Sequence, residues 1–439
     1  VQNTLIGGLA GDALTTGNYN VAIGHKALSL EDTHGYNVAI GREALRSQNA
    51  GADAYNVAVG YHAGFAVTTG VQNTIIGAEA GDALTTGNHN IAIGFRALST
   101  EDTGSNSTAI GYYALNKQND NNNMYNIAIG HSTGQEITTG SNNVLLGGLT
   151  GSIITTGHYN IAIGTQALFT EDAHGRNIAI GHNALKVQNA GADAYNVAVG
   201  HEAGKLITTG IQNTLIGGLA GDAITTGSAN VALGYAALSG EDEHGRNIAI
   251  GYRALVVQNA GADAYNIAIG YQAGHTMTTG TQNTLIGGLA GDALTTGESN
   301  VAIGYSALST EDGDGRNTAV GYKALQDLNA GANAYNVAVG YDAGRRVSTG
   351  IENVTIGSFA GDHLTTGNSN VAVGYQALTA EDGHGKNVAI GHNTLRDQDA
   401  GADAYNTAVG FEAGKVISTG VKNVIIGGLA GDALTTGGF

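Results

Sequence analysis

The amino-acid sequence predicts an all-β protein, a parallel β-solenoid or β-roll of about 25 short coils. A five-residue motif, in which Asn is followed by three mostly aliphatic residues and a Gly, recurs along all 439 residues. Successive motifs lie 17, 17, 19 and 17 residues apart, so the whole pattern repeats every 70 residues. The chain has 71 glycines and no proline, which suits stacked coils because a proline removes a ladder hydrogen bond.

The repeats run without a boundary, so we expect residues 1–439 to be one continuous solenoid. The 70-residue super-repeats begin near residues 3, 73, 143, 213, 283 and 353, and a final coil begins at residue 423. Both ends stop in mid-pattern, and open strand edges invite pairing. We therefore expect this chain to be a segment of a longer fibre, with adjoining fibre segments as partners.

Composition argues against several classes of partner. With 36 acidic and 18 basic residues the net charge is −18, which repels nucleic acid and anionic membrane surfaces. No run approaches the 18 apolar residues of a spanning helix, so we expect no membrane insertion. The chain has no cysteine, and it lacks phosphate-binding loops and nucleophile motifs. We predict no enzyme, no catalytic residue and no cofactor.

Each motif predicts one very short strand. In Val21-Ala22-Ile23 the two larger residues share one face of the strand, and Ala occupies the other. A helix fits less well, because the Gly-rich turns between motifs interrupt the spacing of three to four that helices need. We therefore expect one continuous aliphatic core, lined in the first super-repeat by Ile6, Ile23, Ile40 and Val59.

The opening Asn and the closing Gly are the most constant positions of the motif. The Asn is replaced only once, by Ser107, and we expect it to form a side-chain ladder between coils. The Gly never changes, which indicates backbone angles that other residues avoid. In the first super-repeat these structural positions are Asn3, Gly7, Asn20, Gly24, Asn37, Gly41, Asn56 and Gly60.

A second apolar feature predicts self-association. Seven residues after the opening Asn, Ala recurs at Ala10, Ala27, Ala44 and Ala63. Together with the mid-strand Ala, these residues give each coil a small, flat apolar surface. A monomer rarely leaves such a surface in water along its whole length, so we expect neighbouring chains to cover it.

These motifs resemble two families of fibrous proteins. The NVAIG core is similar to the head repeats of trimeric autotransporter adhesins, which form a left-handed parallel β-roll wound as a trimer. The phrases NVAIGYQAL (370–378) and TTGNHN (85–90) are still more similar to the Asn/Gly-rich repeats of bacteriophage tail fibres. The units here are longer than those of the adhesin heads, which favours a viral fibre.

The resemblance implies an intertwined homotrimer that is extracellular, on a virion tail fibre or a cell-surface appendage. The implied function is a structural fibre shaft that supports host-surface attachment, with a host-surface glycan or protein as a further partner.

Paired carboxylates recur once in each super-repeat and are the first candidates for chemistry. The pairs are Glu31-Asp32, Glu101-Asp102, Glu171-Asp172, Glu241-Asp242, Glu311-Asp312 and Glu381-Asp382. His follows in four copies, at His34, His174, His244 and His384, whereas Gly104 and Asp314 stand at the matching positions. A repeated loop feature is not a single catalytic pocket. We interpret it as a solvated acidic loop and predict no metal site, here or at the Asp12-type positions that would suit calcium.

Aromatic residues follow the fixed Gly in most coils and form the second candidate. The tyrosines of this stripe are Tyr61, Tyr112, Tyr235, Tyr252, Tyr271, Tyr305, Tyr322, Tyr341 and Tyr375. Their rings could stack on sugars, which gives an alternative function, a cell-surface adhesin that binds glycans along its flank. The interpretation we favour is that stacked rings brace successive coils or pack between chains.

A further tyrosine precedes the fourth motif of each super-repeat, after the longer loop. These residues are Tyr55, Tyr125, Tyr195, Tyr265, Tyr335 and Tyr405. We expect them to have a structural role, as a plug that closes the coil where two extra residues enter.

Overall fold

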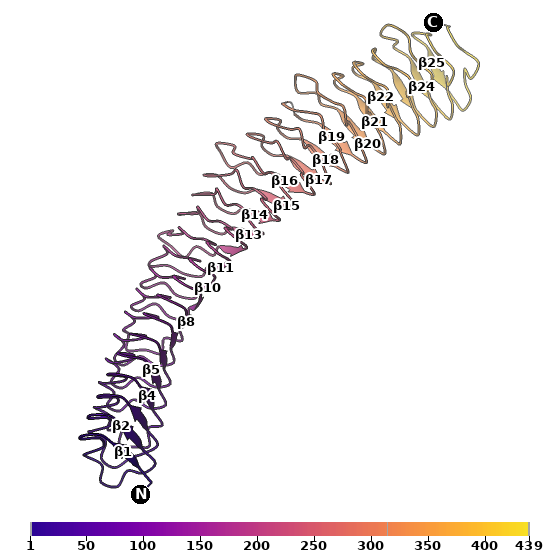
Figure 1. Cartoon of the computed structure of the whole chain (residues 1–439). Helices are drawn as coiled ribbons and strands as arrows, with labels where there is room; N and C mark the ends of the chain where they lie inside the picture. Colours follow the sequence, from indigo (N-terminus) through magenta and orange to yellow (C-terminus); the bar gives the residue numbers. More distant parts are fainter. Residues whose placement is uncertain (1, 314, 438–439) are drawn as a thin grey trace. The chain divides into compact units, whose positions relative to one another are not determined.

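A computed structural model of the chain describes residues 2–313 and 315–437. The predicted fold class is confirmed: the protein is all-β, a parallel β-solenoid of about 25 turns, and none of the described residues is helical. The chain divides into two compact units, Val1–Gly218 and Leu219–Phe439. In each unit the ribbon shows one short strand per coil, with the strands stacked beside one another (Figure 1).

Every strand is three residues long. The first unit contains β1 (Thr4–Ile6), β2 (Val21–Ile23), β3 (Val38–Ile40), β4 (Val57–Val59), β5 (Thr74–Ile76), β6 (Ile91–Ile93), β7 (Thr108–Ile110), β8 (Ile127–Ile129), β9 (Val144–Leu146), β10 (Ile161–Ile163), β11 (Ile178–Ile180), β12 (Val197–Val199) and β13 (Thr214–Ile216). The second unit contains β14 (Val231–Leu233), β15 (Ile248–Ile250), β16 (Ile267–Ile269), β17 (Thr284–Ile286), β18 (Val301–Ile303), β19 (Thr318–Val320), β20 (Val337–Val339), β21 (Val354–Ile356), β22 (Val371–Val373), β23 (Val388–Ile390), β24 (Thr407–Val409) and β25 (Val424–Ile426).

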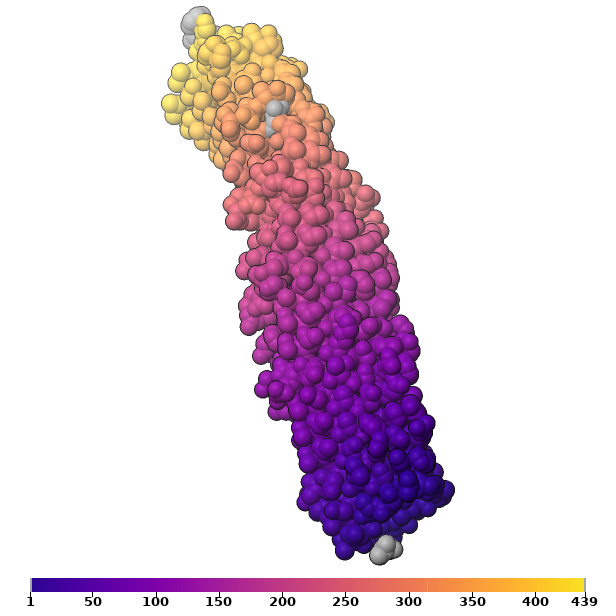
Figure 2. Space-filling model, turned by 90° about the vertical axis from the view of Figure 1, so that its left-hand side faces the viewer, coloured from indigo at the N-terminus to yellow at the C-terminus, as the bar shows by residue number. Residues whose placement is uncertain are grey.

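Strands within a unit pair in parallel and in register with the strand one coil further on. In β2 and β3 the mid-strand residues Ala22 and Ala39 are partners. The register is the same across a 19-residue step, where Ala39 pairs with Ala58 of β4. The two extra residues therefore lie in the loop and leave the strand stack undisturbed. In a space-filling view the coils of each unit follow one another in sequence order along the surface (Figure 2).

The Asn positions form the expected ladder between coils. The backbone N–H of Asn37 donates to Oδ1 of Asn20 at 3.0 Å, and Nδ2 of Asn20 donates to the carbonyl of His34 at 3.0 Å. In the second unit the N–H of Asn336 donates to Oδ1 of Asn317 at 3.1 Å. The rungs thus join a side chain to the backbone of the next coil. Because these Asn side chains are buried, each rung satisfies groups that water cannot reach.

The prediction that the larger strand residues line the core is wrong. The mid-strand Ala22, Ala39 and Ala58 are fully buried, whereas Ile23 and Ile40 remain partly exposed, as does Val59. Ile6 is exposed as well, and it lies in the first strand of the chain. Side chains of a strand alternate between its faces, and the buried Asn that opens each motif faces inward. The mid-strand residue therefore also faces inward, and its two neighbours face outward.

The predicted Ala surface is likewise inside the coil, so it cannot be the contact between chains. Ala27, Ala44 and Ala63 are fully buried within one chain, and only Ala10, in the first coil, is partly exposed. In the second and third coils of each super-repeat, the residue that follows this Ala also lies in the interior. It is a buried Leu with positive φ, such as Leu28 at 51°.

The fixed Gly at the end of each strand is required by the close stacking of the coils. At Gly24 φ is +129°, in a region that other residues rarely adopt. A Cβ atom at this position would lie 2.5 Å from the carbonyl oxygen of Gly41 in the next coil. A coil can therefore approach the next one this closely only where its own strand is followed by Gly.

Candidate functional site

The first and third residues of the strands form an outward-facing apolar surface, which we call the outer strand face. The first residue of all 25 strands is Val, Ile or Thr, and the third is Ile, Val or Leu. Most of these residues are partly exposed, and more exposed examples are Ile163 at 37%, Ile127 at 40% and Leu233 at 43%. No charged residue occupies either position in these strands.

The size of this face matches that of the largest apolar patch on a typical monomeric protein. The first unit stacks 13 strands, and strands lie about 4.8 Å apart, so its part of the face is about 60 Å long. The first and third residues of a strand lie about 7 Å apart, so the strip covers roughly 400 Å². Residues on either side of the strip are not included in this area. The largest apolar patch on a typical monomer is about 300–600 Å² and is often a site of interaction. The second unit carries a strip of the same kind.

The predicted aromatic stripe borders this face. All nine of its predicted tyrosines lie on the surface, with exposed fractions from 39% for Tyr322 to 56% for Tyr271. Except for Tyr61, which stacks on His62 of its own coil, the tyrosines stack on aromatic or imidazole rings of adjacent coils. The ring centroids of Tyr235 and Tyr252 lie 5.7 Å apart and those of Tyr252 and Tyr271 lie 5.5 Å apart, with interplanar angles of 15° and 9°. The stacks extend over the second, third and fourth coils and are interrupted in the first coil, where Gly288 stands in the matching position.

This stacking uses the ring faces that a sugar would need. In Tyr305, Tyr322 and Tyr341 the middle ring has a neighbour on each side, at 5.7 and 5.0 Å. Their edges and hydroxyl groups remain exposed, and a column of stacked rings stabilises adjacent coils. The geometry thus supports the bracing interpretation of the stripe.

The predicted tyrosine plugs are wrong. Tyr55, Tyr125, Tyr195, Tyr265, Tyr335 and Tyr405 each expose about half of the side chain, between 50% and 53%. Each has positive φ, which turns the ring outward. The preceding residue, Ala54 or Met124 for example, is buried in its place. Tyr195, Tyr265, Tyr335 and Tyr405 instead contact basic side chains, as in the hydrogen bond of 2.6 Å from Nη1 of Arg176 to the hydroxyl of Tyr195. Tyr55 stacks on Tyr36.

A buried acidic position corrects the interpretation of the carboxylate pairs. The Glu of every pair is fully buried, and the Asp beside it lies at the surface or partly covered. The Glu lies eleven residues after the opening Asn, at a core position that holds Leu84 and Ile137 in other coils. Burial raises the pKa of Glu171 and Glu241 to about 7, and that of Glu381 to about 8. In each pair, therefore, only the Asp is in contact with solvent.

In the loops that contain a His, this residue lies against the buried Glu. The N–H of His384 donates to Oε1 of Glu381 at 3.2 Å, and its Nδ1 lies 3.7 Å from the same oxygen. The corresponding atoms of Glu241 and His244 are 3.2 and 4.0 Å apart. The structure thus brings Glu, Asp and His together at four of the predicted loops, those at residues 31–34, 171–174, 241–244 and 381–384. Asp314, of a fifth loop, lies outside the described residues.

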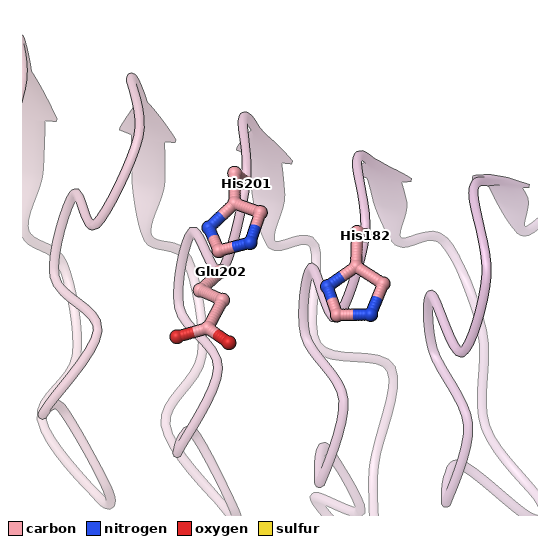
Figure 3. A group of neighbouring side chains, drawn as sticks. All are labelled: His182, His201 and Glu202. Atoms are coloured by element: carbon pink, nitrogen blue, oxygen red, sulfur yellow. The ribbon is translucent and has the colours of Figure 1, made fainter.

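A second group of acidic and imidazole side chains was not predicted as a site. His182 and His201 come from adjacent coils and stack with ring centroids 5.3 Å apart, and Glu202 lies next to them (Figure 3). The carboxylate of Glu202 already has partners, because Nζ of Lys205 lies 3.1 Å from Oε2 and Nδ2 of Asn183 donates to Oε1. Both rings are exposed, so this group belongs to the aromatic stripe.

Known proteins give no family for this chain. A scan against protein-family models and a search of curated proteins both found no match. Within the described residues, no helix is both long enough and apolar enough to cross a membrane.

Proposed function

We propose that this protein is the structural shaft of an extracellular fibre, a phage tail fibre or a similar surface appendage, in which copies associate through the outer strand face. The observation that carries the proposal is the uncharged, mostly aliphatic strip that runs along each compact unit. Contact between chains through the outer strand face replaces the Ala contact that the sequence led us to expect, because those Ala residues lie inside the coil.

The coil itself supports a mechanical role. Successive strands pair in register, buried Asn side chains bond each coil to the next, and aromatic rings stack along the flank. All of these interactions repeat along the stacking direction, so each coil is held mainly by its neighbours. Such a unit resists local opening most strongly in its interior, which suits a load-bearing spacer between attachment points.

The border of the outer strand face supports contact with a second copy. Beyond the first strand residue, Arg176 pairs with Asp193 at 2.6 Å, and Lys386 pairs with Asp403 at 2.6 Å. On the other side lies the aromatic stripe. An apolar centre with aromatic residues and a polar rim is the usual anatomy of a protein interface. The resemblance to trimeric fibres favours three copies, with one outer strand face from each chain directed at the common axis.

The mass in solution tests the proposal. Light scattering on the purified chain is expected to give three times 44.2 kDa. Because the chain contains no cysteine, single thiols report the contact without background. We expect the thiol of Ile269→Cys, on the outer strand face, to be protected from maleimide and to cross-link chains through a short bis-maleimide. The thiol of the control Ala262→Cys, on an exposed loop of the preceding coil, should react freely and give no cross-link.

Two results would count against the fibre. A mass of 44.2 kDa over a wide range of concentrations, with equal labelling of the two thiols, would show that the outer strand face is solvated. An oligomer in which Ala262→Cys is protected and Ile269→Cys is not would place the contact on another surface.

A further inference from the structure

We propose that the aromatic stripe contains a sugar-binding clamp, formed by Tyr271 and Tyr305 on either side of Gly288, which takes a pyranose ring with equatorial substituents. The three residues lie two positions after β16, β17 and β18, so they occupy matching places in three successive coils. All three coils belong to the second compact unit. The inference concerns the flank of a single chain, so it stands independently of the contact between chains.

Hydrogen bonds between the backbones hold the three positions in line. The strands β16, β17 and β18 pair in register. The N–H of Leu289 donates to the carbonyl of Tyr271 at 2.9 Å, and the N–H of Ser306 donates to the carbonyl of Gly288 at 3.0 Å. The clamp is therefore set by the coil itself before a ligand arrives, which lowers the cost of ordering a site on binding.

Each tyrosine of the clamp has one ring face that no other ring covers. Tyr271 stacks on Tyr252 of the coil before it, and Tyr305 stacks on Tyr322 of the coil after it. Within residues 2–313 and 315–437, neither ring has a further aromatic or cationic neighbour. Both are more exposed than Tyr322, which has a ring on each side. Because the stacks run along the coils, the two open faces are directed at the coil of Gly288.

The glycine leaves the space between these faces open at its base. Apart from its chain neighbours, a Cβ atom at Gly288 would have only two atoms within 4 Å, namely Cδ2 and Cε2 of Tyr305, at 3.5 and 3.8 Å. The position has room for a side chain, and the sequence places none there.

The next super-repeat shows the same space filled by the protein itself. Phe359 stands there in place of Leu289, and its ring centroid lies 5.4 Å from that of Tyr341 and 6.1 Å from that of Tyr375, edge-on to both. These two tyrosines are 48% and 44% exposed, less than the 56% and 50% of their counterparts in the clamp. One six-membered ring therefore fits between tyrosines two coils apart, and the shorter Leu289 leaves this place to a ligand.

Two matching positions in the first unit lack a feature of the clamp. Before the first coil of the second super-repeat, the ring of Tyr61 is already covered by His62, with centroids 3.9 Å apart. After the first coil of the third super-repeat, Thr165 stands where the clamp has Tyr305. The clamp requires two uncovered rings with a small residue between them, and Gly288 meets both conditions.

The width of the gap indicates a saturated ring. Two coil steps separate the tyrosines by about 9.6 Å. A flat aromatic ligand in contact with both faces would fill only about 7 Å, twice the contact distance of roughly 3.5 Å between carbon atoms. A pyranose chair is thicker, because axial C–H bonds project from both of its faces. Both faces must be apolar to lie against tyrosine rings, which requires equatorial hydroxyl groups, as in the β-glucose configuration.

Neighbouring side chains favour a sugar over a cation, the other kind of ligand that aromatic clamps bind. Gln272, the residue after Tyr271, is partly exposed, and its side-chain amide has no hydrogen-bond partner in the part of the chain that the structure describes. It is available to sugar hydroxyl groups. Among the residues that follow the stripe, the nearest charged ones on either side are Arg253 and Lys323. Both are basic and oppose a cationic ligand.

Hydroxyl-radical footprinting of the full chain, read residue by residue with mass spectrometry, tests the proposal. The probe is cellotetraose at millimolar concentration, in which every ring substituent is equatorial. We expect it to lower the oxidation of Tyr271 and Tyr305 several-fold relative to Tyr341 and Tyr375. The control is β-1,4-linked galactotetraose, which scavenges radicals equally but carries one axial hydroxyl per ring, and it should protect neither pair.

Two variants test the site without removing a ring of the clamp. Gly288→Tyr adds a ring between Tyr271 and Tyr305, where adjacent coils already carry Tyr, and should abolish the effect of cellotetraose. The double variant Ser358→Gly/Phe359→Leu empties the filled space of the next super-repeat and should extend the protection to the tyrosines that border it. The circular dichroism spectrum of both variants should match that of the natural chain.

Three outcomes would overturn the proposal. The first is that cellotetraose protects neither Tyr271 nor Tyr305, and the second is that it protects them equally in Gly288→Tyr. The third is equal protection by galactotetraose, or protection by choline in place of either sugar, which would show that the clamp takes a different ligand.

Discussion

The inward orientation of the mid-strand residue makes a direct prediction about Ala249 in β15. This residue is fully buried and pairs in register with Ala232 and Ala268 of the neighbouring strands. We expect Ala249→Leu to destabilise its coil, because the interior there is already filled by Leu255. The outward-facing Ile250, in contrast, should accept Leu with little effect on the same coil.

The first coil of each super-repeat shows how a large mid-strand residue is accommodated. Leu285 is fully buried at the position equivalent to Ala249, and Gly291 takes the place of the Leu. A Cβ atom at Gly291 would lie 2.8 Å from Cδ2 of Leu285, so the two positions compete for one volume. The double variant Ala249→Leu/Leu255→Gly should therefore recover part of the stability that each single change removes.

The magnitudes follow from packing. Adding a side chain of this size to a full core costs about 1–3 kcal/mol. Removing the Leu255 side chain costs about 2–5 kcal/mol, reduced by roughly 1 kcal/mol because Gly relieves its left-handed backbone conformation. If the added Leu fills the volume that Leu255→Gly leaves, the double variant should lose at least about 2 kcal/mol less stability than the sum of the two single changes. Ile250→Leu should cost less than about 1 kcal/mol.

Native-state hydrogen exchange read by mass spectrometry is the suitable assay, because stacked repeats open locally and do not unfold in one step. The opening free energy of residues 247–265 is compared among the natural chain, both single variants, the double variant and Ile250→Leu. The reasoning is refuted if Ala249→Leu is no more destabilising than Ile250→Leu. It is also refuted if the double variant loses as much stability as the sum of the two single changes.

Three further predictions concern the ladder, the fixed Gly and the buried acids. Asn56→Ala removes a buried ladder rung and should lower the opening free energy of its coil by about 3 kcal/mol in the same exchange assay, whereas an unchanged value would show that the rung contributes nothing. Gly24→Ala places a Cβ against the backbone of the next coil, so we expect loss of protection in both coils, and wild-type exchange there would contradict the stacking. Because burial raises the pKa of Glu171 and Glu241 to about 7 and that of Glu381 to about 8, the folded chain keeps protons that the unfolded chain releases near pH 4.5. The stability that these three groups contribute should be greatest below pH 4.5 and fall as the pH rises to about 8, and an opening free energy of their coils that rises over this range would exclude the effect.

The fold could be predicted from the sequence because the repeat itself carries the information. A nearly invariant Asn and an invariant Gly at steps of 17 or 19 residues favour one way of stacking three-residue strands in register, and the loops absorb the two extra residues. The error lay in the direction of the side chains. In Val21-Ala22-Ile23 the alternation is the same whichever face is buried, so size alone suggested that Ile23 points inward. Asn20 held the decisive signal, since a buried ladder residue fixes the faces of the residues that follow it.

The buried Glu was missed for a related reason. Glu171 stands beside an Asp and near a His, and this local composition suggests a solvated loop. Aligning the coils by their opening Asn places Glu101 at the same position as Leu84 and Ile137, which are core residues. The sequence therefore contained the evidence of burial. It did not contain the hydrogen bonds, which depend on whether Gln118 or another group reaches the carboxylate.

The two columns of the outer strand face differ in a way that strand formation alone does not explain. Val, Ile and Thr all favour β-structure because they are β-branched, and the first column accepts all three, with Thr at Thr74 and Thr108 for example. The third residue is never Thr in any of the 25 strands, and Leu146 and Leu233 replace β-branching with a longer apolar side chain. The third position is thus always aliphatic, even where the residue is not β-branched. A surface that must remain apolar although it lies outside the core of its own chain is a surface that another molecule covers, which is the basis for assigning the contact between chains to this face.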